Sequence, residues 1–184
     1  TFISMLKKFA ISFLLLALTG CALRSPFGGS PKPPAQPAVD LSAAPIAATV
    51  AVFVPRDIAE KRSHFVYAHE GVWFPEGEVI TATSLRGFAQ AFQTARPADE
   101  MQKADVIVKV GGNSVLNPMV QRYYVDAFGQ CLTPQGRLLE EFRASAVAET
   151  EFAYTKAFDD AYFKAFREIA ARVALSDKCR GAAP

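Results

Sequence analysis

Residues 154–175 read YTKAFDDAYFKAFREIAARVAL, and this stretch decides the fold. Its large apolar residues recur at helical spacing along one stripe, which consists of Phe158, Tyr162, Ala165, Ile169 and Val173 and is widened by Phe163 and Phe166. Charged residues cover the remaining surface, as in an amphipathic helix that packs one side against a core. An aromatic stripe of this kind is typical of core packing rather than of a cofactor site. The stretch therefore predicts a long helix that covers other elements.

The preceding sequence supplies candidate strands. Residues 48–54 are β-branched and almost wholly apolar until Pro55, which predicts an interior strand. Residues 105–110 alternate cleanly up to Gly111-Gly112-Asn113, where we expect the strand to break. Residues 119–128 and 138–147 are two longer candidates whose mixed composition predicts one solvated face, joined by a turn over residues 133–136.

A second helix is predicted over residues 79–95. Its apolar residues Leu85, Phe88 and Phe92 fall on one helical face, and Pro97 is expected to end it because a residue before proline is pushed out of the helical region. Residues 56–62 predict a loop and residues 65–68 have strand propensity. The aromatic segment over residues 71–77 is interpreted as a hairpin arm or an ordered loop.

These elements predict an α+β fold. We expect a two-layer sandwich, in which two amphipathic helices cover one face of a four- to five-stranded, mostly antiparallel sheet. The globular domain is assigned to residues 46–178 and a short tail to residues 179–184.

The amino-terminal sequence has a different character. An uncharged run from Phe9 to Leu18 follows Lys7-Lys8, with Met5 as the expected start, and this is the pattern of an export signal. The run is too short to cross a bilayer as a stable helix, which needs about 20 apolar residues. It closes on Leu18-Thr19-Gly20-Cys21, which resembles the lipobox of bacterial lipoproteins. The alternative is a secretory peptide with an incidental cysteine.

The lipobox resemblance implies that residues 1–20 are removed and that Cys21 carries the lipid anchor. In that family the residue after the cysteine directs sorting, and Ala22 implies the outer membrane, with the protein on its periplasmic side. Residues 21–45 are rich in proline and cannot bury a core, so we expect an extended tether. The family's multiple acyl chains would make a firm membrane anchor.

Charge and cysteine content narrow the possible partners. The sequence has 20 Lys and Arg and 18 Asp and Glu, so loss of Lys7 and Lys8 with the signal leaves the two charges equal. A neutral chain without a basic stripe argues against a nucleic-acid partner. Cys131 and Cys179 remain as an even pair in an oxidising compartment, which favours a disulfide over two free thiols. Such a bridge would close a loop of about 48 residues and stabilise the fold by about 4 kcal/mol.

The sequence contains no pattern that we interpret as catalytic, metal-binding or cofactor-binding. Its two histidines, His64 and His69, would point to opposite faces of an extended segment, which disfavours a shared metal ion. Neither histidine belongs to a recognisable nucleophile motif. Asp159 and Asp160 are adjacent on the predicted helix and diverge by about 100°. We therefore expect a protein that is not an enzyme and holds no cofactor.

The aromatic segment is the candidate partner-binding site. Tyr67, His69, Trp73 and Phe74 concentrate large side chains within a short stretch, and Trp and Tyr are enriched at interface hot spots. The alternative is that these aromatic residues only complete the core. Exposure of some of them would indicate a docking surface for another protein.

The order of elements, together with Asp126-Ala127-Phe128 leading to Gly136-Arg137-Leu138-Leu139, resembles small envelope lipoproteins of the YajG and PelC type. This resemblance implies a fold related to the amino-terminal domain of TolB. It also implies an accessory or structural subunit of an envelope assembly, such as a secretion, export, pilus or flagellar complex, with a homo-oligomeric ring as one form. The alternative function is a periplasmic auxiliary lipoprotein that binds lipid, glycan or peptidoglycan in an apolar pocket between helices and sheet.

Overall fold

The computed structural model describes residues 44–67, 70–98, 104–150 and 154–180. The export signal, the lipobox with Cys21, almost all of the tether and His69 lie outside these residues, and so do residues 181–184 of the expected tail. The strands are β1 (Ile46–Phe53), β2 (Ser63–Tyr67), β3 (Glu70–Phe74), β4 (Phe92–Pro97), β5 (Val106–Asn117), β6 (Arg122–Leu132) and β7 (Leu138–Glu149). The helices are α2 (Arg56–Ala59), α3 (Glu76–Ala91), α4 (Tyr154–Leu175) and α5 (Asp177–Arg180).

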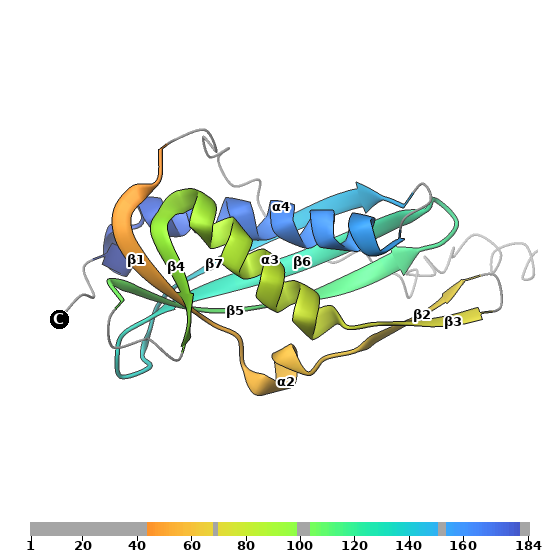
Figure 1. Ribbon diagram of the computed structural model, residues 1–184, viewed down its shortest axis with the longest axis horizontal. Coiled ribbons are helices and arrows are strands. Elements are labelled where there is room, and N and C mark those ends of the chain that lie inside the picture. Colours follow the sequence, from red (N-terminus) through yellow and green to blue (C-terminus); the bar gives the residue numbers. More distant parts are fainter. Residues whose placement is uncertain (1–43, 68–69, 99–103, 151–153, 181–184) are drawn as a thin grey trace, which may run out of the picture. The chain divides into compact units, whose positions relative to one another are not determined.

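Five strands form one sheet in the order β4-β1-β5-β6-β7, while β2 and β3 form a separate antiparallel hairpin (Figure 1). β1 pairs in parallel with both β4 and β5. The longer ladders, β5 with β6 and β6 with β7, are antiparallel, so the sheet as a whole is mostly antiparallel. α3 and α4 lie on one face of this sheet (Figure 1). The predicted two-layer α+β fold is therefore confirmed.

One predicted helix end is wrong. The chain leaves the helix after Ala91, and residues 92–97 form β4, which pairs with β1 at the edge of the sheet. Phe92 is buried and stacks on Phe88 across this change of conformation. Pro97 is the last residue of an edge strand, a position where its missing N–H is tolerated.

The predicted strand break at Gly111-Gly112-Asn113 is also wrong, because β5 continues to Asn117. A Cβ atom on Gly111 would lie 2.5 Å from the Cδ1 atom of Ile58 and 2.5 Å from the Cζ atom of Phe128. These two side chains pack over the strand at that point. The glycine therefore marks a close approach within a strand rather than its end.

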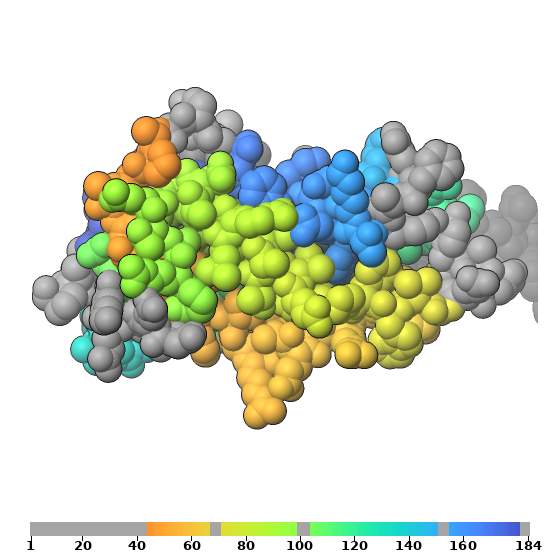
Figure 2. Space-filling model, in the orientation of Figure 1, coloured from red at the N-terminus to blue at the C-terminus, as the bar shows by residue number. Residues whose placement is uncertain are grey.

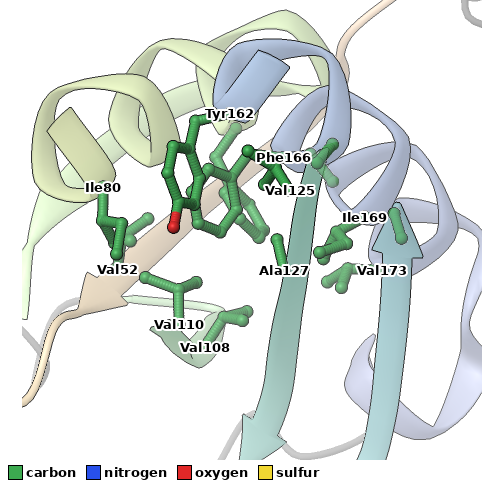
Figure 3. Close-up of a cluster of buried hydrophobic side chains, with 14 of the residues drawn as sticks. Val52, Ile80, Val108, Val110, Val125, Ala127, Tyr162, Phe166, Ile169 and Val173 are labelled. Carbon is green, nitrogen blue, oxygen red and sulfur yellow. The ribbon is translucent and has the colours of Figure 1, made fainter. Parts of the chain in front are cut away.

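The core lies between the helices and the sheet, and the stripe of α4 supplies its largest side chains. Figure 3 shows Tyr162, Phe166, Ile169 and Val173 of α4 in one cluster with valines of several strands: Val52 of β1, Val108 and Val110 of β5, and Val125 of β6. α3 packs closely on α4 at Gly87, where an added Cβ would lie 3.0 Å from the Cβ of Phe166.

A disulfide joins Cys131 of β6 to Cys179 of α5, with 5.7 Å between their Cα atoms. Both cysteines are buried. This is the pair that the sequence predicts as bridged. It ties the short final helix to the sheet across 48 residues of chain.

Candidate functional site: a buried glutamate and an exposed apolar end

The most connected polar group of the described residues is the carboxylate of Glu76, which lies at the start of α3 and is fully buried. Its Oε1 atom accepts hydrogen bonds from the hydroxyl of Ser114 at 2.7 Å and from the hydroxyl of Tyr162. Its Oε2 atom accepts one from the hydroxyl of Ser63 and forms an ion pair with Lys61, whose Nζ atom is 3.0 Å away. The segment before β2, β2 itself, β5 and α4 therefore all meet at this carboxylate.

The environment of Glu76 keeps it ionised. Burial acts to raise its pKa, but the hydrogen bonds from Ser63, Tyr162, Ser114 and Lys61 together outweigh burial and lower the pKa below the ordinary value. The pKa of Tyr162 is raised, first by its own burial and then by the charge of Glu76. A carboxylate has about four acceptor positions, and all of them are used here. Glu76 is thus unavailable as a general base, and its role is to hold these elements together.

Lys61 also covers part of the sheet. β1 pairs with β5 only from Val106 to Lys109, which leaves the rest of that β5 edge without a partner strand among the described residues. The Nζ atom of Lys61 reaches this edge, at 3.1 Å from the carbonyl oxygen of Gly112 and 2.8 Å from the Oδ1 atom of Asn113. The ion pair with Glu76 holds the lysine in that position. A backbone acceptor at this unpaired edge is thereby satisfied, as strand edges require.

Within the described parts of the chain, no three His, Cys, Asp or Glu side chains are grouped so that they could hold a metal ion. His64, one of the two histidines, lies against Trp73, with 4.6 Å between the ring centroids. No helix among the residues that the structure describes is long and apolar enough to span a bilayer.

Exposed apolar side chains gather at one end of the domain. Of ten large apolar residues that are exposed in the described chain, eight lie on the hairpin or where β5, β6 and β7 meet near the β5–β6 turn. We call these eight the apolar end: Val66, Val72, Trp73, Val115, Met119, Val120, Tyr124 and Val147. The other two, Leu138 and Leu175, lie elsewhere: Leu138 pairs with Leu132 at the far end of β6, and Leu175 ends α4.

The sheet part of the apolar end is a row across three strands. Val115 of β5 lies opposite Tyr124 of β6, and Tyr124 lies opposite Val147 of β7. Residues directly opposite each other in a sheet share a face, and this face is the one that α3 and α4 leave uncovered. Met119, 89% exposed, and Val120 extend the row into the β5–β6 turn.

The hairpin part is placed by its buried residues. The ring of Phe65 lies 5.6 Å from that of Tyr123, and the ring of Phe74 lies 6.0 Å from it, so the hairpin rests against the first residues of β6. Figures 1 and 2 show the hairpin, in yellow, at the surface on the side where the β5–β6 turn lies. Both parts of the apolar end therefore belong to the same end of the domain.

The predicted partner-binding residues separate in the structure. Trp73 is 64% exposed, whereas Phe74 is 5% exposed and packs against Phe65, Tyr123 and Phe158. Phe74 thus belongs to the core, as the alternative interpretation held, and only Trp73 of this pair faces solvent. Tyr67 ends β2, and His69 lies outside the described residues.

Sequence reasoning did not identify Val115, Met119, Val120, Tyr124 or Val147 as exposed. The exposed face of a strand shows as alternation, but the alternation of β6 does not tell which set of residues is covered. Glu76 was also missed as a buried group. The available sequence signal was the glycine that follows it in Pro75-Glu76-Gly77. In the structure this glycine marks a close contact, because a Cβ atom on Gly77 would lie 2.1 Å from the carbonyl oxygen of Ala59.

No protein-family model and no curated protein matches this sequence. Solved structures with similarity to the chain include protein XCC0632 from Xanthomonas campestris, of the family DUF330, with a TM-score of 0.46 and 11% identity over 74% of this chain and 86% of that one. They also include a PelC dodecamer from Paraburkholderia phytofirmans, with a TM-score of 0.45 and 10% identity over 73% of this chain and 91% of that one. PelC is of the type that the sequence resembles. At these identities and TM-scores, the similarities carry no conclusion about function.

Proposed function

We propose that this chain is a non-enzymatic lipoprotein of the outer membrane that faces the periplasm and serves as an accessory subunit of an envelope assembly. The observation that carries the proposal is the apolar end, where eight exposed large apolar side chains gather at one end of a well-packed domain. A concentration of exposed apolar side chains at one end of a domain indicates that another protein binds there. Self-association of the chain is part of the proposal.

Two features support an exported, anchored protein. The Cys131–Cys179 disulfide is of a kind that persists in oxidising compartments such as the periplasm. The sequence up to Cys21 supplies the lipobox resemblance, and the proline-rich tether after it gives the domain reach from the membrane. Acylation at Cys21 would hold the chain at the bilayer without a spanning helix.

The buried chemistry favours a structural role over catalysis or ligand binding. Glu76 is saturated with donors, so it supports packing rather than proton transfer. The alternative function requires an apolar pocket between helices and sheet. Aromatic and aliphatic side chains of the described residues pack against one another in that interface (Figure 3), which favours the accessory-subunit proposal over this alternative.

Lipid attachment is tested by growth with labelled palmitate. We expect the full chain to take up label and the Cys21→Ser variant to take up none. An unlabelled wild-type chain would refute the anchor.

Docking is tested by purifying the tagged full chain from membranes after chemical cross-linking. We expect Trp73→Ala and Met119→Ser to lose the cross-linked complexes that the wild type forms with other proteins. Leu175→Ala is the matched control, because Leu175 is an exposed apolar residue away from the apolar end. Equal complex formation by all four proteins would refute docking through the apolar end.

A further inference from the structure

β7 is an edge strand of the five-stranded sheet, and one half of it is open. The guanidinium of Arg172 donates a hydrogen bond to the carbonyl oxygen of Arg143 at 3.0 Å. Near the start of β7, Glu140 binds Ser176 and Lys178, which follow α4. These contacts cover the first half of the edge.

The second half, residues 145–149, has no strand partner on its outer side among the described residues. Backbone groups in an antiparallel strand point alternately to its two neighbours. Arg143 directs its carbonyl to the outer edge, and Thr150 donates its N–H to Gln121 on the β6 side. Ser145, Val147 and Glu149 therefore direct their N–H and C=O groups outward, as a template for a further strand.

We propose that this edge pairs with the same edge of a second copy of the chain, antiparallel and two-fold symmetric about Ala146. In this register Ser145 lies opposite Val147 of the second copy. The side chain of Arg143, whose carbonyl oxygen is held by Arg172, lies opposite the side chain of Glu149 of the second copy, so the backbone pairing is confined to the open half. The symmetry makes each contact twice. The exposed side chains of Arg143 and Glu149 therefore form two pairs of opposite charges, one on each side of the two-fold axis.

Charge disfavours two of the alternative registers. An axis at Ser145 would place Glu141 opposite Glu149, and an axis at Arg143 would place two arginines opposite each other, which is unfavourable. Axes nearer the start of β7 meet the edge that Arg172 and the residues after α4 cover. Among the registers on the open half, the axis at Ala146 pairs opposite charges.

The occupant is a second copy because the required pattern stands in β7 itself. A strand whose charges complement Arg143 and Glu149 carries an acid and a base six residues apart in antiparallel order, and β7 itself carries both. The ion pairs that Arg143 and Glu149 form within one copy do not prevent them from pairing with a second copy. Arg143 pairs with Glu141 and Glu149 with Arg122 at the exposed surface, where ion pairs contribute little.

This inference deepens the self-association within the proposed function. It shares Val147 with the apolar end, but it does not depend on the lipid anchor or on Trp73 and Met119. It predicts how variants with reversed charges self-associate, which is measured by sedimentation of the full chain in detergent. We expect Arg143→Glu and Glu149→Arg each to weaken self-association about tenfold, because each puts like charges in both contacts. The double variant should restore it. Arg137→Glu, an exposed charge in the turn before β7, is the control and should have no effect.

A second measurement uses two differently tagged full chains, one with Ser145→Cys and one with Val147→Cys. Opposed residues of a hydrogen-bonded pair have Cα atoms about 5.5 Å apart, within disulfide range. Mild oxidation should therefore link the two tags more than either tag to itself, and Trp73→Ala should not alter this yield. Unchanged sedimentation of both single variants, failure of the double variant to recover, or linkage to a different protein instead would overturn the inference.

Discussion

The buried carboxylate of Glu76 gives the sharpest test of how this fold is held together. In the Glu76→Gln variant the size of the side chain is kept, but the charge is removed and one acceptor oxygen becomes a donor. The oxygen of the amide can still accept from Ser114 and Tyr162. The amide nitrogen would face Lys61, which has no acceptor, so that contact is lost.

The expected cost follows from these contacts. A hydrogen bond to a charged group contributes roughly 1.5–3 kcal/mol, and a neutral one about 1 kcal/mol. Loss of the Lys61 contact and conversion of the remaining bonds to neutral ones are partly offset because a charge no longer has to be buried. We therefore expect Glu76→Gln to lower the free energy of unfolding by about 3 kcal/mol at neutral pH. For a domain of this size this corresponds to a melting temperature about 9 °C lower.

The measurement is thermal unfolding of the full chain, followed by circular dichroism between pH 3 and pH 7. The pKa of Glu76 is lowered in the folded state, so its contribution is present above the unfolded value of about 4.3 and is lost as pH falls through the lower folded value. The difference in unfolding free energy between the wild type and Glu76→Gln should therefore become smaller below about pH 4. Glu78→Gln, an exposed carboxylate on the same helix, is the control. Equal stability at pH 7, or a gap of the same size at pH 3, would refute the reasoning.

Three further predictions concern packing and the cross-link. Replacing both Cys131 and Cys179 by Ser should lower the free energy of unfolding by about 4 kcal/mol in urea titration, because the disulfide closes a loop of 48 residues. Gly77→Ala should destabilise by about 2 kcal/mol in the same assay, since its Cβ would meet the backbone carbonyl of Ala59. Phe158→Ala should cost about 4 kcal/mol, because the ring is fully buried among other aromatic rings; a loss below 1 kcal/mol would contradict the packing described above.

The sequence allowed the layers of the fold to be predicted, because its long periodic segments bury one side. The stripe of α4 and the apolar run of β1 each have a pattern that only one environment satisfies. β4 could not be predicted in the same way. Residues 92–97 continue the period of α3 at Phe92, and only the parallel pairing with β1 decides that they are extended.

The predicted strand break at Gly111-Gly112 was wrong for a related physical reason. Within a single sequence, Gly111-Gly112 indicates a break, because glycine lowers the stability of a strand. In the structure these positions let Ile58, Phe128 and Tyr162 pack against the backbone of β5. That information is contained in residues far away along the chain, which a local pattern does not reach.

In the hairpin, alternate residues of a strand point to opposite faces, so one face packs on the core and the other contributes to the apolar end. Phe74 and its neighbour Trp73 point to opposite faces of β3, so burial of the first against Phe65 fixes exposure of the second. A shift of one residue in the pairing would bury Trp73 and expose Phe74. Substituting Phe74 should therefore destabilise the domain and disturb the apolar end together. Substituting Trp73 should change docking alone, so that a large loss of stability in Trp73→Ala would contradict this register.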